Sequence, residues 1–202
     1  MEATNDMTVT EWWETAHKNQ DKKWLTGSTV RSYLDFFKAY EIYAKAEIVL
    51  EIGCGMGRAT QQMACNDSKD VTVMDISVIA LAQIMSIARM FNSKGHMYLP
   101  TDYFDLAISH LVAQHMCDAD LYAQMRSVIR SLTASGVFLL QFADAKGRPP
   151  SYTIAHEKGG GVLRTPAEVG ERVEAFGGEV VETVERKINS NVTWWGLHIM
   201  RS

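Results

Sequence analysis

The chain has 202 residues, 47% hydrophobic and 22% charged, with a net charge of −4. This composition predicts one soluble globular domain and excludes a largely disordered chain, while the negative charge disfavours nucleic-acid binding through phosphates. The three cysteines, Cys54, Cys65 and Cys117, show no CxxC spacing, which predicts free thiols, no metal site and a cytoplasmic protein. No run of about 18 apolar residues predicts a membrane span, and the segment MEATNDMTVT has no features of a secretory signal.

Helices are predicted for the first 45 residues. Thr8 and Glu11 have the spacing of a capping box, and a short helix is predicted from about Thr10 to Asn19. A second helix is predicted by apolar residues at positions i, i+3, i+4 and i+7, namely Val30, Tyr33, Leu34 and Phe37.

Strands and helices then alternate. Short apolar, β-branched runs predict buried strands at 47–53, 70–76, 103–109 and 136–142, with a further short strand at His96–Leu99 (HMYL). Helices are predicted at 59–64, from an N-cap at Ser77 to Met90, from an N-cap at Asp118 to about 132, and from the Thr165, Pro166, Glu168 start to Gly177. The runs 179–188 and 192–200, joined by NSN, predict a closing β-hairpin.

This alternation predicts an α/β fold with a parallel sheet and helices on both faces. In such sheets ligands bind beyond the carboxyl ends of the strands, where the strand order reverses. The segment VLEIGCGMGRAT falls at that point, with glycines at 53, 55 and 57 directly after the first predicted strand.

The glycine spacing favours a nucleoside ligand without phosphates. A dinucleotide fingerprint would need a glycine at Arg58, and a P-loop would need Lys-Ser or Lys-Thr, which this segment lacks. The spacing therefore disfavours a nicotinamide oxidoreductase. A second interpretation stays open, in which the glycines form only a tight turn, Glu51 pairs with a lysine and Asp75 caps a helix.

The segment VLEIGCGMGRAT, with its acidic Glu51, resembles motif I of class I S-adenosylmethionine-dependent methyltransferases. The resemblance continues in VTVMDIS, LPTDYFDLAISHLVAQHM and RSVIRSLTASGVFLLQF, and spans about residues 48–200. It implies a single Rossmann-like domain with a seven-stranded, mostly parallel sheet, helices on both faces and an antiparallel C-terminal strand. It also implies an N-terminal helical cap or lid at 1–45, a cofactor-binding methyltransferase domain at 46–202, S-adenosyl-L-methionine as cofactor and S-adenosyl-L-homocysteine as product.

The resemblance implies which residues hold the cofactor. Asp75, at the end of the second strand, would accept the ribose hydroxyls, and Glu51 would hold the methionine ammonium group. The acid that usually follows the third strand is missing, so adenine recognition is expected from backbone near His96 and Met97. The complete expected set is Glu51, Gly53, Cys54, Gly55, Gly57, Asp75, Ile76, Met97 and Ser109.

Methyl transfer needs the acceptor held in line with the methyl group, and a base only where the acceptor loses a proton of high pKa. Ser109, His110, Gln114 and His115 follow the fourth strand, next to where the methyl group should project. The two histidines are candidate bases; the alternative is that they form hydrogen-bonded walls of the site.

An aromatic N-terminal segment completes the predicted site. Trp12, Trp13, His17 and Trp24 are expected to form a lid over the substrate, or alternatively a helix packed on the sheet. The expected substrate-binding residues are Trp12, Trp13, His17 and Gln114.

The predicted function is methyl transfer to a nitrogen or oxygen of a small molecule. No appended domain for a nucleic-acid or protein partner is expected, and the Asp/Asn-Pro-Pro-Tyr/Phe signature of amino-group DNA methylation is absent. The alternative is a protein that binds the cofactor without transferring its methyl group, as a sensor or scaffold.

Overall fold

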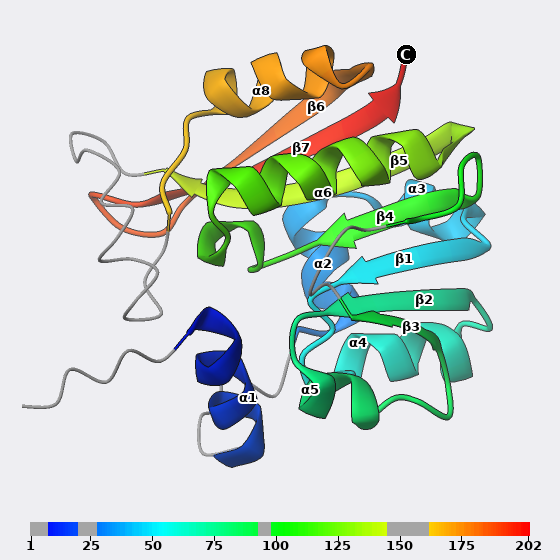
Figure 1. Cartoon of the computed structure of the whole chain (residues 1–202). Helices are drawn as coiled ribbons and strands as arrows, with labels where there is room; N and C mark the ends of the chain where they lie inside the picture. The colour runs from blue at the N-terminus through cyan, green and yellow to red at the C-terminus, as the bar shows by residue number, and fades with distance from the viewer. Residues whose placement is uncertain (1–7, 20–27, 93–97, 145–161) are drawn as a thin grey trace, which may run out of the picture.

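The computed structural model describes residues 8–19, 28–92, 98–144 and 162–202, and Figure 1 shows their arrangement. The helices are α1 (Val9–Asn19), α2 (Val30–Phe37), α3 (Tyr40–Lys45), α4 (Arg58–Gln61), η2 (Gln62–Asn66), α5 (Val78–Ala82), η3 (Ala113–His115), α6 (Asp118–Ser131) and α8 (Pro166–Ala175). The strands are β1 (Ile48–Ile52), β2 (Asp70–Asp75), β3 (Arg89–Asn92), β4 (Phe104–Ser109), β5 (Leu132–Asp144), β6 (Gly178–Lys187) and β7 (Thr193–Arg201).

The seven strands form one sheet in the order β3-β2-β1-β4-β5-β7-β6. Strands β1 to β5 pair in parallel, whereas β7 is antiparallel to both β5 and β6. The predicted fold class, including the antiparallel C-terminal strand, is confirmed. The strand order reverses between β1 and β4, so the glycine segment after β1 lies at the point where ligands bind in this kind of sheet.

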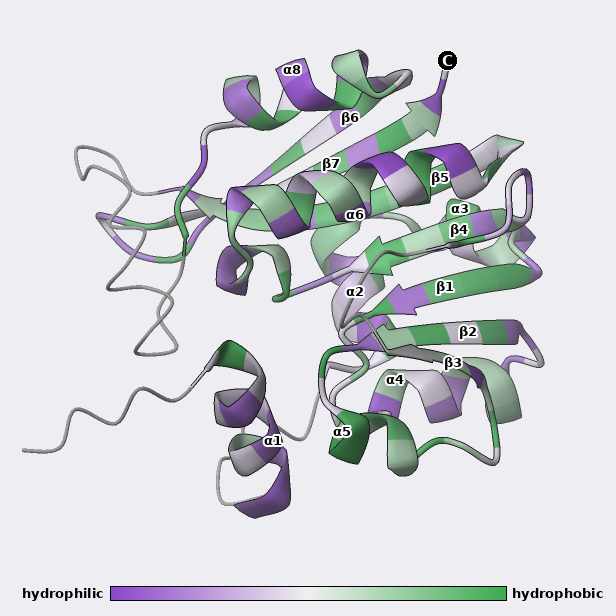
Figure 2. Ribbon diagram, viewed as in Figure 1, coloured by the Kyte–Doolittle hydropathy of each residue, from purple (hydrophilic) through white to green (hydrophobic). Residues whose placement is uncertain are grey.

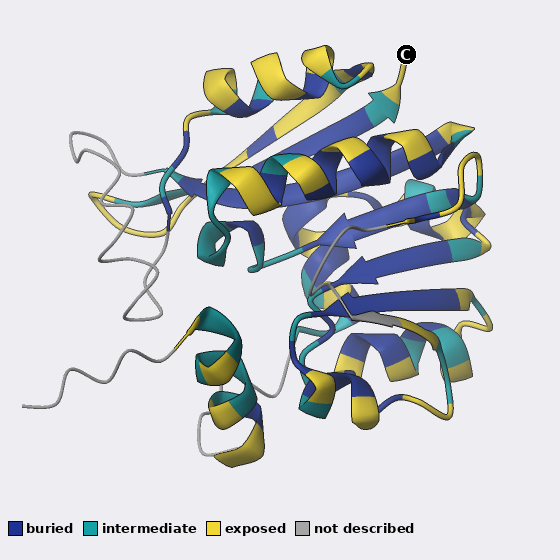
Figure 3. Cartoon of the chain, in the orientation of Figure 1, coloured by how far each residue is buried: buried dark blue, intermediate teal, exposed yellow. Residues whose placement is uncertain are grey.

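Each face of the sheet is covered by its own layer of helices. Helices α2 to α5 pack on one face, and α6 and α8 pack on the other. The hydrophobic residues concentrate in the central strands β1, β2, β4 and β5, which are largely buried, while most of β6 and the outer sides of α6 and α8 are exposed (Figures 2 and 3). Trp194 and Trp195 alternate along β7 and pack on opposite faces of the sheet, each against the hydrophobic layer of its own face.

The helix predicted to run from Ser77 to Met90 is much shorter than expected. Ser77 is the N-cap, as predicted, but α5 ends at Ala82 and β3 follows within the predicted helix. Turns joined by i to i+3 hydrogen bonds fill the interval, including Ile84 N to Leu81 O at 3.1 Å. Such turns keep apolar residues near helical spacing, which explains the error. Within the predicted strand at 96–99, residues 96 and 97 lie outside the described residues, and 98 and 99 are not in a strand.

Other predicted ends shift by a few residues. The N-cap of α6 is Cys117, whose sulfur accepts from the Asp120 N–H, rather than Asp118. The capping box of Thr165 and Glu168 is present as predicted. Strand β5 begins at Leu132, four residues earlier than expected, and helix α3 had no sequence prediction.

Candidate functional site

The three glycines after β1 differ in their surroundings. All three have positive φ, at +73° for Gly53, +51° for Gly55 and +74° for Gly57. A Cβ on Gly53 would lie 2.2 Å from Val112 Cγ2, and one on Gly57 would lie 2.0 Å from Ile84 Cγ2. A Cβ on Gly55 would meet no described atom within 4 Å. The outer glycines therefore allow close packing, and Gly55 leaves open space where a ligand can approach the backbone.

Asp75 ends β2 beside this loop and is 7% exposed. Its carboxylate accepts from the N–H of Gly55 at 3.1 Å and from the N–H of Ser77 at 2.9 Å. Burial raises the pKa of Asp75, partly offset by these two bonds and by the nearby His17. The Cys54 thiol lies 3.8 Å from the same carboxylate, and burial raises its pKa. Asp75 thus fixes the glycine loop and keeps lone pairs for further donors.

Glu51 is completely buried in β1 and held by two hydroxyl groups. The Tyr33 hydroxyl donates to Oε1 at 2.7 Å, and the Thr60 hydroxyl donates to Oε2 at 2.5 Å. Burial raises the pKa of Glu51 to about 7, although the two hydroxyls lower it; the charge of Asp75 raises it further. Sequence reasoning missed the roles of Tyr33 and Thr60. Tyr33 belongs to the apolar pattern of one predicted helix and Thr60 to the helix after the glycines, and neither pattern shows that the hydroxyl reaches a carboxylate on β1.

The residues after β4 have contrasting environments. Ser109 is fully buried, and its hydroxyl has no hydrogen-bond partner within the described residues. The ring of His110 lies 5.2 Å from Tyr33 and 5.4 Å from Phe36, and its Nδ1 lies 3.1 Å from the Ser28 hydroxyl. Burial, aided by the charge of Arg186, lowers the pKa of His110 to about 4. His110 is therefore a neutral, enclosed ring near neutral pH.

The short turn η3 carries the other two predicted side chains. Gln114 Nε2 lies 3.3 Å from His115 Nε2, so the two side chains meet. The ring of His115 packs 5.2 Å from Trp13 of α1, edge to face. His115 thereby links the turn after β4 to α1.

Helix α1 lies beyond the carboxyl ends of β1, β2 and β4 (Figure 1). The Glu14 carboxylate accepts from the N–H of Val78 at 2.8 Å and of Ile79 at 3.3 Å, at the start of α5. His17 is 3% exposed; burial lowers its pKa, while the charges of Asp75 and Glu14 raise it. The helix therefore contacts the β2 side through Glu14 and His17, and the β4 side through Trp13.

The structure brings most of the predicted site residues to one edge of the sheet. Ile76 follows Asp75 in the turn before α5, and Trp12 contacts Trp13 with ring centroids 4.7 Å apart. Met97, His96 and Trp24 lie outside the described residues. Gly55 and Ser109 offer two features that suit a bound nucleoside cofactor: open space beside the Gly55 backbone, and a buried Ser109 hydroxyl with no hydrogen-bond partner among the described residues.

Two searches returned nothing among the described residues. No group of three or more His, Cys, Asp or Glu in the described ranges is arranged to hold a metal ion. No described helix is both long and apolar enough to cross a bilayer.

A family model described as a methyltransferase domain matches residues 50–140 of this chain. No curated protein matches the chain. Among solved structures, the chain is similar to the Burkholderia thailandensis 1,6-didemethyltoxoflavin-N1-methyltransferase bound to 1,6-didemethyltoxoflavin and S-adenosylhomocysteine. That match has a TM-score of 0.72 and 13% identity, covering 96% of this chain and 87% of the other.

Two further solved structures are similar. One is a Geobacter sulfurreducens S-adenosylmethionine-dependent methyltransferase bound to S-adenosyl-L-homocysteine. That match has a TM-score of 0.63 and 13% identity, and it covers 93% of this chain and 97% of the other. The other is an O-methyltransferase from neocarzinostatin biosynthesis bound to S-adenosyl-L-homocysteine and 1,4-dihydroxy-2-naphthoic acid, with a TM-score of 0.57 and 17% identity. That match covers 84% of this chain and 55% of the other. The matching methyltransferase domain at residues 50–140 and the strand order show the Rossmann-like fold of class I S-adenosylmethionine-dependent methyltransferases.

Proposed function

We propose that this methyltransferase transfers a methyl group to a nitrogen or oxygen atom of a small molecule. The observation that carries the proposal is the placement of α1, which contacts the start of α5 after β2 through Glu14 and the turn after β4 through Trp13. A helix in that position would cover a small acceptor and exclude water from it. Two similar structures hold small acceptors, 1,6-didemethyltoxoflavin and 1,4-dihydroxy-2-naphthoic acid.

The cofactor would be held by the residues around the glycine loop. Asp75 would accept the ribose hydroxyls, and Glu51 would attract the methionine ammonium group. Gly53, Cys54 and Gly55 would lie along the methionine part, and the Ser109 hydroxyl would gain the partner that it lacks among the described residues. Gly57, Ile76 and Met97 complete the proposed set.

The chain contributes to the reaction mainly by position. When bound, the cofactor would supply a methyl group on a sulfonium: an aligned nucleophile bonds to the methyl carbon, and the carbon–sulfur bond breaks to release S-adenosylhomocysteine. Holding the acceptor in contact accounts for much of the rate, because it removes the entropic cost of alignment. With a pKa of about 4, His110 is a poor base, and we propose it as a wall of the acceptor site. His115 is the remaining candidate base for acceptors that lose a proton.

We propose that the closing element is α1. Helices α2 and α3 belong to the hydrophobic layer on the sheet, with Phe37 fully buried and Gly196 of β7 making room for it. Helix α1 has no such packing in that layer and is joined to the domain by Glu14, Trp13 and His17. Among the described helices of the proposed cap at 1–45, α1 is therefore the one that would open without disrupting the core.

The experiment is to measure S-adenosylhomocysteine release from S-adenosylmethionine with a panel of small N- and O-nucleophiles. Asp75→Ala should weaken cofactor binding at least tenfold, since it removes charge-assisted hydrogen bonds of about 1.5–3 kcal/mol each. Asp70→Ala, at the opposite end of the same strand, is the matched control and should bind normally. Binding without turnover for every acceptor would instead favour a sensor or scaffold. No cofactor binding by the wild-type chain would refute the proposal.

A further inference from the structure

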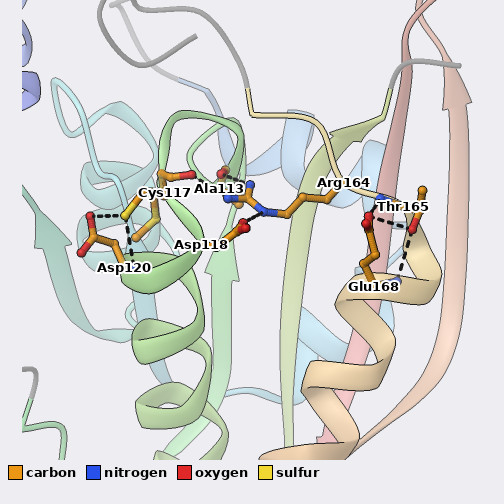
Figure 4. Close-up of polar contacts among 8 residues, drawn as sticks. Ala113, Cys117, Asp118, Asp120, Arg164, Thr165 and Glu168 are labelled. Carbon is orange, nitrogen blue, oxygen red and sulfur yellow. Dashed lines mark hydrogen bonds and ion pairs between the residues drawn. The ribbon is translucent and has the colours of Figure 1, made fainter. Parts of the chain in front are cut away.

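Arg164 makes an unusual set of contacts between β5 and the loop after β4. Its residue is 3% exposed, and its backbone N–H donates to the Ala143 carbonyl at 2.8 Å, next to a bridge between Ala143 and Leu163. The guanidinium group donates to the Ala113 carbonyl at 2.9 Å and to the Met116 carbonyl at 2.7 Å, and Nε donates to Asp118 at 2.8 Å (Figure 4). Arg164 therefore spans from the end of β5 to the start of α6.

The two carbonyl acceptors flank the turn that carries Gln114 and His115. Between them, the Gln114 carbonyl accepts from the N–H of Val162 at 2.5 Å. The turn η3 has three residues and few hydrogen bonds of its own, and so short a 3₁₀ turn needs outside support to keep one conformation. Arg164 and Val162 supply that support at three carbonyls of the turn, those of Ala113, Gln114 and Met116.

Gln141 holds the same turn from the other side. It is fully buried in β5, its side-chain oxygen accepts from the Leu111 N–H at 2.6 Å, and its amide donates to Gln114 Oε1 at 3.3 Å. Leu111 has a φ of +64°, a conformation that costs a non-glycine residue about 1–2 kcal/mol. The backbone of this loop would therefore relax if its contacts were removed. A chain of side-chain contacts runs from Gln141 through Gln114 to His115 and orients the last two.

The arginine is suited to this task and a lysine is not. Three acceptors lie around one planar group, which matches the fixed fork of donors on a guanidinium. Burying that charge costs several kcal/mol, and Asp118, whose side chain is 48% exposed, is the carboxylate that pairs with it. Two of the three side-chain bonds go to the backbone of the turn rather than to α8 or the sheet. The contacts point to control of the turn.

We propose that Arg164 is a positioning residue for the acceptor side of the site. It fixes the turn Ala113–Met116 so that Gln114 and His115 face the position of the transferred methyl group. The inference rests on the proposed function, in which these two residues contact the acceptor. It assigns Arg164 no contact with the cofactor, since Glu51, Asp75 and the glycine loop have no contact with the Arg164 side chain among the described residues.

The test is Arg164→Lys, with Arg172→Lys as the matched control on exposed α8. Amide hydrogen exchange, resolved by residue, should accelerate by about tenfold or more at residues 113–116, because two hydrogen bonds to the turn are lost. Exchange in β1 and β2 and the affinity for S-adenosylmethionine should stay within about twofold of the wild type. With any acceptor found in the panel, kcat or the acceptor KM should worsen while the cofactor KM is kept.

Three results would overturn the inference: unchanged exchange at 113–116, uniformly faster exchange throughout the domain, or a parallel loss of cofactor affinity. If Arg164→Lys does not fold, Asp118→Ala carries the test, because it removes the partner of Nε and should accelerate exchange at the turn to a smaller degree. Asp120→Ala, also in the first turn of α6, is its control. A wild-type chain that does not turn over would defeat the proposed function, and the exchange result would still decide the role of Arg164.

Discussion

Glu51 should make both folding stability and cofactor affinity depend on pH near neutrality. Its pKa is raised from 4.5 to about 7, mainly because the carboxyl group is completely buried. Between these two values the folded chain keeps a proton that the unfolded chain has lost. Stability therefore falls as pH rises through this window, and a shift of that size corresponds to about 3 kcal/mol in total. Glu51→Gln, which cannot ionise, should remove this dependence.

The same group should control binding of S-adenosylmethionine with the opposite sign. A carboxylate attracts the ammonium group of the cofactor, and a carboxylic acid does not. The ionised fraction of Glu51 rises from about a tenth at pH 6 to about a half at pH 7, so affinity should rise about fivefold over that interval. Binding at pH 6 should also take place with release of a proton.

The assays are urea unfolding at pH 5, 6, 7 and 8 and calorimetric titration at pH 6 and 7 in two buffers of different ionisation enthalpy. The wild type should lose stability relative to Glu51→Gln as pH rises, and only the wild type should release a proton on binding. Thr60→Val is a useful second variant, since removing a hydroxyl donor should raise the pKa of Glu51 further. Parallel stability profiles for wild type and Glu51→Gln, together with pH-independent binding, would refute the reasoning.

Two further substitutions test the loop and the lid. Gly55→Val should abolish S-adenosylmethionine binding in a folded chain, because its side chain would enter the open space beside the loop at a strained φ, whereas Gly170→Val on α8 should bind normally by calorimetry. Glu14→Ala should speed hydrogen exchange throughout α1 by about fivefold or more, since a carboxylate at a helix start contributes about 1–2 kcal/mol when partly buried. Thr15→Ala, at an exposed position of the same helix, is its control; equal exchange in the two variants would mean that Glu14 does not anchor the helix.

The order of the elements and the cofactor half of the site followed from local patterns. Glu51 and Asp75 could be placed because each lies at or near the end of a predicted strand, and the fold determines which edge of the sheet that end faces. The third strand could not be placed correctly, because the turns at Ile84 and Ile87 keep the residue spacing of a continuing helix. An edge strand as short as β3, with Arg89 paired to Asp70, carries too little apolar signal to compete with that pattern.

The contacts that organise the site were beyond sequence reasoning for a different reason. The Tyr33 hydroxyl meets Glu51 across 18 positions of the chain, and the Arg164 side chain meets the Ala113 carbonyl across 51. One residue of each pair looks ordinary by itself: a tyrosine in an amphipathic helix, and a backbone carbonyl that any residue would provide. Only the packing of distant elements gives them a partner.

The two halves of the proposed site, one for the cofactor and one for the acceptor, depend on different parts of the chain. The cofactor half depends on backbone: a glycine loop of fixed φ values, two strand ends and the space that Gly55 leaves open. The acceptor half depends on replaceable side chains, with the turn after β4 held by Gln141 and Arg164 and covered by α1. A point mutation there reshapes the acceptor side and leaves the cofactor loop intact. A lineage built on this chain can therefore drift from one acceptor to another without passing through a form that has lost its methyl donor.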